Sequence, residues 1–177
     1  MFFDRSQARK PAVDIYGGIV GQARIPLFYE AFQTPDTPGG RFDMILIHMF
    51  LVISRLNHEG PETKTLSQDL YDLMFADMDR NLREMGVGDV GVPIRIRKMA
   101  EDFQGRMAAY EAALAEKDDR ALIDVLDRNL YQEISPGAAR LAAMATYVRE
   151  QHDFLADQDF GEISIGNIRF RQPSFRE

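Results

Sequence analysis

The sequence contains no cysteine and no tryptophan. Without cysteine the chain can form no disulfide framework, no thiolate zinc site and no thiol nucleophile. Its formal net charge is -7, so it has no general excess of lysine and arginine to neutralise nucleic-acid phosphates. These absences exclude a disulfide scaffold, a cysteine enzyme and a general nucleic-acid binder. They make a reducing compartment, the cytoplasm, the expected location.

Long apolar runs are also scarce. The longest, MILIHMFLVI from Met44 to Ile53, is about half as long as a helix that crosses a bilayer. We interpret it as a helix buried on nearly every side, with His48 as a hydrogen-bonded core residue rather than a metal or haem ligand. The start of the chain, MFFDRSQARKP, lacks the apolar run of a secretory signal, so we expect no export signal.

Apolar residues recur at helical spacing through most of the chain, which predicts an all-α fold. We expect a single-domain bundle of about six helices, with a further short helix after Pro26. Residues 1–10 are expected to be a flexible N-terminus and residues 11–157 the helical domain. From Gln158 the period changes, so residues 158–177 should form an extended tail or a small hairpin about Gly166 and Asn167.

Several residues have the character of helix ends. Thr37 can cap a helix whose first residue is Pro38, and Ser135 can do the same before Pro136. Thr65 and Gln68 have the spacing of a capping box, and Gly86 is placed to end that helix in a left-handed conformation. Asp118 or Asp119 can cap the helix that carries Leu122 to Leu130.

The connector GVGDVG, from Gly86 to Gly91, matches the dinucleotide-binding pattern G-x-G-x-x-G. That chemistry requires a strand before the glycines and a helix immediately after them. Here a helix is expected before the motif, and Pro93 removes a donor near the start of the next helix. The pattern therefore favours a helix stop and a tight interhelical turn over nucleotide binding.

Charged residues surround this connector. Asp77 and Asp79 diverge by about 200 degrees around a helix, so they cannot form a metal cluster unaided. Asp79 with Arg83, and Arg80 with Glu84, have the spacing of surface ion pairs.

A cluster of positive residues follows the same turn. Arg95, Arg97 and Lys98 could orient the encounter with a partner. No nucleophile elbow, phosphate-binding loop or local acid and base pair is present, although acids brought together by the fold could still form a site.

Three stretches carry a likeness to a known family. They are IYGGIVGQAR with PLFYEAF between Ile15 and Phe32, then PDTPGGRFDMILIH, then MFADMDRNLREMGVGDVGVPIRIRKMAEDFQGR. In these residues the chain resembles the ubiquinol-cytochrome c chaperone family, helical assembly factors of the respiratory cytochrome bc1 complex. The likeness covers roughly residues 13–130, and DMDRNLREMGVGD is its most specific part.

The resemblance implies a non-enzymatic assembly chaperone that needs no cofactor and escorts newly made cytochrome b, or another bc1 subunit, toward the membrane. It also implies a ribosome or a small partner protein as further partners, with action in the cytoplasm or at the inner face of the membrane. The expected partner-binding residues are the family signature and the basic cluster after it: Asp79, Leu82, Arg83, Glu84, Met85, Gly86, Gly88, Asp89, Val92, Arg95, Arg97 and Lys98.

The residues themselves leave other functions open. Nine methionines and twelve phenylalanines are consistent with an adaptable apolar groove between helices, with the stretch from Phe75 to Met99 as one wall. Such a groove could instead bind a small molecule such as haem or a quinone, or hold an enzymatic site. An oligomerisation or scaffold module is a third interpretation.

Overall fold

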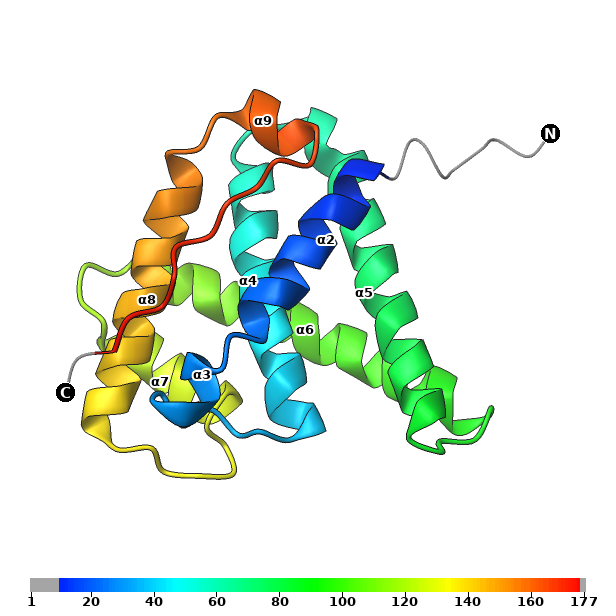
Figure 1. Cartoon of the computed structure of the whole chain (residues 1–177), viewed down its shortest axis with the longest axis horizontal. Coiled ribbons are helices and arrows are strands. Elements are labelled where there is room, and N and C mark those ends of the chain that lie inside the picture. Colours follow the sequence, from blue (N-terminus) through cyan, green and yellow to red (C-terminus); the bar gives the residue numbers. More distant parts are fainter. Residues whose placement is uncertain (1–9, 176–177) are drawn as a thin grey trace.

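The computed structural model describes residues 10–175, which form an all-helical bundle with no strand among them (Figure 1). Its helices of ten residues or more confirm the predicted all-α bundle, and α3 is the short helix expected after Pro26. Of the expected flexible N-terminus, residues 1–9 lie outside the described residues. The elements are α2 (Lys10–Ala23), α3 (Leu27–Glu30), α4 (Pro38–Asn57), the 3-10 helix η1 (Pro61–Thr63), α5 (Lys64–Glu84), α6 (Gly91–Ala115), α7 (Arg120–Asn129), α8 (Ala138–Ala156) and α9 (Phe160–Ser164).

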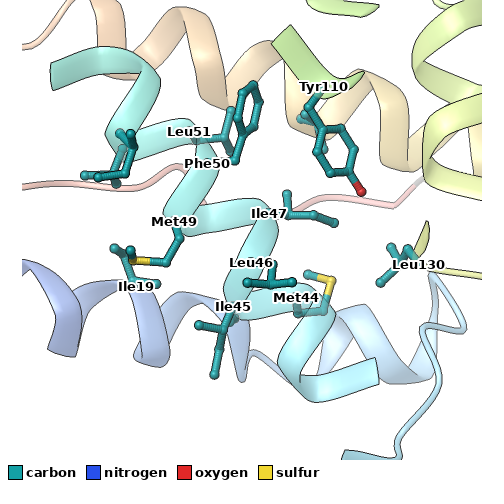
Figure 2. Close-up of a cluster of buried hydrophobic side chains, with 14 of the residues drawn as sticks. Ile19, Met44, Ile45, Leu46, Ile47, Met49, Phe50, Leu51, Tyr110 and Leu130 are labelled. Carbon is teal, nitrogen blue, oxygen red and sulfur yellow. The ribbon is translucent and has the colours of Figure 1, made fainter. Parts of the chain in front are cut away.

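Helix α4 is the centre of the bundle, and it packs against α2, α6 and α8. It can occupy that position because apolar side chains project from nearly all of its surface, as Figure 2 shows around Met49 and Phe50. Burying each large apolar side chain stabilises the fold by about 1.5–3 kcal/mol. The predicted buried helix is confirmed. Within residues 10–175, no helix combines the length and apolarity needed to cross a bilayer.

Two of the predicted helix ends are confirmed. Thr37 caps α4 by accepting a hydrogen bond from the backbone N–H of Gly40, with 3.1 Å between Oγ1 and N. Gly86 follows α5 with a φ of +83°, the left-handed conformation that glycine adopts without a Cβ penalty.

Two other predicted helix starts are wrong. Thr65 does not cap α5, because η1 runs directly into this helix and Lys64 already belongs to it. Ser135 and Pro136 do not start α8, because Gly137 takes a φ of +89° and turns the chain before Ala138.

The end of the chain forms an extended tail, as predicted, but this tail begins only after a short helix. The hairpin prediction is wrong, since the part of the chain that the structure describes contains no strand. The short helix α9 forms instead, with the carboxylate of Asp159 accepting from the backbone N–H of Glu162 at 3.1 Å. After a turn at Gly166, residues 167–175 run back along α8 without regular secondary structure (red in Figure 1). We call residues 167–175 the C-terminal strap.

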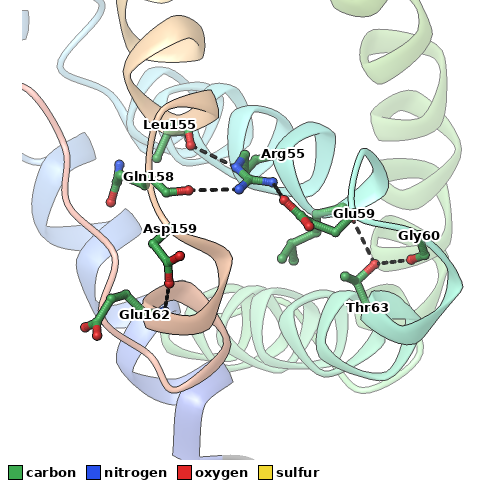
Figure 3. Close-up of polar contacts among 9 residues, drawn as sticks. Arg55, Glu59, Gly60, Thr63, Leu155, Gln158, Asp159 and Glu162 are labelled. Atoms are coloured by element: carbon green, nitrogen blue, oxygen red, sulfur yellow. Dashed lines mark hydrogen bonds and ion pairs between the residues drawn. The ribbon is translucent and has the colours of Figure 1, made fainter.

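Arg55 joins the end of α4 to the end of α8 (Figure 3). Its Nε donates to the carbonyl of Leu155 and its Nη2 to the carbonyl of Gln158, both at 2.9 Å, and it also pairs with Glu59. The carbonyls at a helix C-terminus lack partners within the helix, so a buried arginine is well suited to satisfy them. This contact fixes Gln158, which holds the C-terminal strap.

Candidate functional site

A groove of about 660 Å³ opens between the end of α2, the start of α4 and the end of α5. This volume is in the range of pockets that enclose most of a ligand. The stretch from Phe75 to Met99, predicted as one wall, contributes nearly half of the lining side chains. The lining residues are Arg24, Asp36, Thr37, Pro38, Gly39, Arg41, Phe42, Ile45, Met78, Asn81, Leu82, Glu84, Met85 and Met99. We call this feature the α4–α5 groove.

The interior of the α4–α5 groove is apolar and rich in methionine. Met78 is buried, and Met99 and Phe42 are half-buried, whereas Met85 lines the groove with 59% of its surface exposed. Methionine side chains are unbranched and polarisable, so they can repack against apolar surfaces of different shape. Met85 thus adds exposed apolar surface to a groove that is already lined mainly by apolar side chains.

The rim of the groove is charged. Arg41 Nε lies 2.6 Å from a carboxylate oxygen of Asp36, and this hydrogen bond lowers the pKa of Asp36 below its usual value. Arg24 and Glu84 lie on the same rim. Charges around an apolar surface orient an incoming partner more than they add to its affinity.

The connector between α5 and α6 has the geometry of a helix stop followed by a restart. The N–H of Gly86 donates to the carbonyl of Arg83 at 2.9 Å, and the N–H of Val87 donates to that of Leu82 at 3.0 Å. This pair of bonds is a Schellman motif. The carbonyl of Gly88 then accepts from the N–H of Gly91 at 2.8 Å and begins α6. The glycines therefore serve an interhelical turn, as predicted, and not a phosphate-binding loop after a strand.

Arg83 fixes the shape of this connector. Its Nε lies 2.7 Å from a carboxylate oxygen of Asp79, and its Nη1 pairs with Asp89 in the turn. The hydrogen bonds to Asp79 and then Asp89 raise the pKa of the Arg83 guanidinium. The predicted pair of Asp79 and Arg83 is confirmed.

The other predicted pair near the connector is not formed. Arg80 pairs with Asp77 instead of Glu84. The reason is tertiary: Asp77 lies at the interface with α2, where it accepts a hydrogen bond from the hydroxyl of Tyr16 at 3.0 Å. Asp77 and Asp79 thus face different partners, as their divergence around the helix predicted.

The predicted partner-binding residues separate into distinct places. Leu82, Glu84 and Met85 line the α4–α5 groove, whereas Asp79, Arg83 and Asp89 form the ion-pair cluster behind the turn. Val92, in the first turn of α6, is fully buried. The remaining members form the turn or lie exposed on α6 without lining the groove: Gly86, Gly88, Arg95, Arg97 and Lys98. Their part in binding stays a prediction.

Sequence reasoning missed the opposite wall of the groove. Arg41, Phe42 and Ile45 come from the first turns of α4, and Arg24 follows the end of α2. No local spacing connects these residues to α5, because only packing brings the three helices together. The stretch PDTPGGRF was the signal that could have pointed to this wall, because it contributes to the family likeness although no function was assigned to its residues.

His48 is the buried core histidine that its apolar neighbours predicted. It has no exposed surface, and both ring nitrogens have partners: Nδ1 lies 2.7 Å from the carbonyl of Met44, and Nε2 lies 2.8 Å from the hydroxyl of Tyr147. Burial lowers the pKa of His48 to about 4. A ligand could use either nitrogen only by replacing one of these hydrogen bonds.

Comparison with known proteins gives consistent results. A family model described as Ubiquinol-cytochrome C chaperone matches residues 30–170. The ubiquinol-cytochrome-c reductase complex assembly factor 1 of Xenopus laevis is 26% identical over 96% of this chain and 84% of its own length. The Mus musculus protein of that name is 24% identical over 90% of this chain, which spans about half (54%) of the mouse protein.

A solved structure shares the fold. The crystal structure of the Cbp3 homolog from Brucella abortus superposes with a TM-score of 0.84 at 36% sequence identity. The match covers 95% of this chain and 93% of that one. The bundle and its groove-forming helices are therefore built on a fold already observed by crystallography.

Proposed function

Because this chain belongs to the ubiquinol-cytochrome C chaperone family, we propose that it is a non-catalytic assembly chaperone of the ubiquinol-cytochrome c reductase (bc1) complex. The family predicted from the sequence is confirmed by the match over residues 30–170. The proposed mode of action is to shield an apolar segment of an unassembled subunit in the α4–α5 groove. The observation that carries this mode is the groove itself, which an exposed Met85 lines together with the less exposed apolar side chains of Phe42, Met78 and Met99.

Cytochrome b is the proposed client, since the family resemblance points to this subunit. Its membrane-spanning segments must be kept from aggregating before assembly, because exposed apolar surface associates readily in water. A groove that covers part of such a segment lowers this risk without changing any covalent bond.

The test is to place a charge in the groove and follow the client. Met85→Asp changes a side chain that is 59% exposed, so the fold should persist while the groove gains a charge that an apolar segment must desolvate. In cells that lack the native gene and carry tagged variants, we expect recovery of cytochrome b with the Met85→Asp protein to fall at least about fivefold. Assembled bc1 complex, measured from its reduced-minus-oxidised haem spectrum, should fall with it.

Val13→Asp is the matched control. Val13 is also an exposed aliphatic residue, 50% exposed, but it lies on α2 outside the groove. We expect this variant to recover cytochrome b like the unaltered protein. Equal recovery by the two variants, with both folded by circular dichroism, would remove the α4–α5 groove from the proposal.

A further inference from the structure

The C-terminal strap is held through its main chain by glutamine side chains. Gln158 accepts from the N–H of Arg169 at 2.9 Å and donates to the carbonyl of the same residue at 2.8 Å. Gln151 does the same for Arg171, at 2.9 and 3.0 Å, and Gln22 donates to the Arg171 carbonyl at 2.6 Å. These five bonds reach only main-chain atoms, so they would form with any non-proline residue at either position.

The glutamines are positioned by contacts that do not involve the strap. Gln22 and Gln151 are buried, and each donates a second hydrogen bond to the hydroxyl of Tyr147, at 3.0 and 2.9 Å. The main chain of Gln158 is fixed by Arg55, as Figure 3 shows. The side-chain amides of these glutamines are thus oriented by the helices before the strap binds. A site that is pre-organised in this way loses less entropy when a chain binds to it.

From Ile168 to Arg171 the side chains of the strap alternate between the bundle and solvent. Ile168 and Phe170 face Gly18 of α2, and the Phe170 ring lies 5.9 Å from that of His48. Arg169 and Arg171 are exposed between and after them, and the Arg171 guanidinium makes only a solvent-exposed ion pair with Glu150 at 3.6 Å, which adds little to the binding. Farther along, the ring of Phe175 packs 5.2 Å from that of Phe32. Gln172 is exposed and Pro173 is buried, so the alternation ends after Arg171. The cleft therefore accepts apolar residues at positions 168 and 170 and leaves positions 169 and 171 facing solvent.

The strap can leave without breaking the helices. It is joined to α9 through the turn at Gly166, whose φ is +99°. Among residues 10–175, no hydrogen bond joins the main chain of residues 169–175 to another main chain, and the main chains of Arg169 and Arg171 bond only to glutamine side chains. Its release would break no helical or sheet hydrogen bond, in contrast to the removal of α8 or α2.

We propose that the cleft between α2 and α8 is a second binding site, which takes an extended polypeptide segment of a client, with two apolar residues placed like Ile168 and Phe170. The C-terminal strap is its built-in occupant and competes with the client segment. This site is separate from the α4–α5 groove and does not depend on it. It would let the chaperone hold an extended stretch of an unassembled chain by its backbone, regardless of the residues that point to solvent.

The test uses the full chain with a specific protease site inserted between Gly166 and Asn167. After cleavage, a fluorescent peptide of residues 167–175 (NIRFRQPSF) is added and its anisotropy measured. We expect saturable exchange into the cleaved protein, and binding to the uncut protein weaker by at least about tenfold, because the attached strap has a high effective concentration. The helical circular dichroism signal should stay unchanged throughout.

Variant peptides and proteins test which atoms of the segment the cleft recognises. A peptide with Arg169→Ala and Arg171→Ala should bind within about threefold of the original, since the glutamines contact only the main chain. A peptide with Ile168→Asp and Phe170→Asp should not bind. Gln151→Ala in the protein should weaken binding by about tenfold, whereas Met85→Asp in the α4–α5 groove should leave it unchanged.

Three results would overturn the proposal. The first is loss of the helical signal before the cleaved strap exchanges, which would make the strap part of the core. The second is binding that follows the identity of residues 169 and 171 rather than the apolar positions. The third is a dimer of the uncut chain in light scattering that disappears on cleavage, which would assign the site to the strap of a second copy.

Discussion

The hydroxyl of Tyr147 on α8 donates its one proton to Nε2 of His48 on α4, over 2.8 Å. The direction follows from the other partners, because the same oxygen accepts from the side-chain amides of Gln22 and Gln151. Nε2 of His48 is therefore the acceptor, and Nδ1 carries the hydrogen that reaches the carbonyl of Met44 at 2.7 Å. One neutral tautomer of a buried histidine thus connects α4 to the glutamines under the C-terminal strap.

Tyr147→Phe should destabilise the protein by about 1–3 kcal/mol, because it leaves buried polar groups of His48, Gln22 and Gln151 each short of one partner. The measurement is urea-induced unfolding followed by circular dichroism. Tyr71→Phe is the control, since the Tyr71 hydroxyl has no hydrogen-bond partner within residues 10–175. A similar loss of stability in the two variants would contradict the hydrogen-bond network around the Tyr147 hydroxyl.

Asp43 and His48 should give opposite pH dependences of the free energy of unfolding. Burial raises the pKa of Asp43 to about 6, with Arg106 beside it offsetting part of this, and burial lowers the pKa of His48 to about 4. The native state therefore binds more protons than the unfolded state at Asp43 and fewer at His48. As pH falls from 6 to 4, Asp43 adds stability and His48 removes it, each by about 2 kcal/mol.

Asp43→Asn separates the two effects. The amide can still accept from Arg106 but does not titrate, so the stability of this variant should fall more steeply than that of the unaltered protein between pH 6 and pH 4. Urea unfolding at pH 4, 5 and 6 provides the measurement. All other ionisable groups are shared, so parallel pH profiles would show that Asp43 titrates in its ordinary range.

Gly86→Ala should destabilise the protein by about 1 kcal/mol, since alanine is strained at a φ of +83° although a Cβ there would meet no atom within 4 Å. Gly105→Ala is the matched control. A Cβ at Gly105 also meets no atom within 4 Å, but this residue lies inside α6, where alanine should stabilise by up to about 1 kcal/mol. Thermal unfolding should give shifts of opposite sign, and two shifts of the same sign would refute the conformational argument.

Charge reversal of Arg95, Arg97 and Lys98 to Glu should reduce capture of cytochrome b, most strongly at low salt, because these exposed cations would steer the encounter. The measurement is client recovery at several salt concentrations. A control with the same change in net charge is Lys117, Arg120 and Arg128 to Glu, which alters exposed residues near and on α7. If neither triple variant changes the recovery of cytochrome b, the cations on α6 take no part in partner binding.

Helical periodicity was sufficient to predict the all-α bundle, because a helix with one apolar face must bury it and a helix that is apolar all round must be central. Local chemistry likewise predicted the cap at Thr37 and the left-handed end at Gly86, since both depend on atoms within a few residues. The starts of α5 and α8 were missed because neighbouring turns, at η1 and Gly137, changed where the helical hydrogen bonds begin.

The sequence by itself determined the helices, the buried position of α4 and the family, because periodicity, capping and motif residues are properties of short stretches. Only the tertiary structure decided that Arg41 and Phe42 face Met85 across a groove, and that three glutamines hold the C-terminal strap. The physical reason is that these contacts join residues far apart in the chain. Their geometry depends on how whole helices pack, which no local pattern encodes.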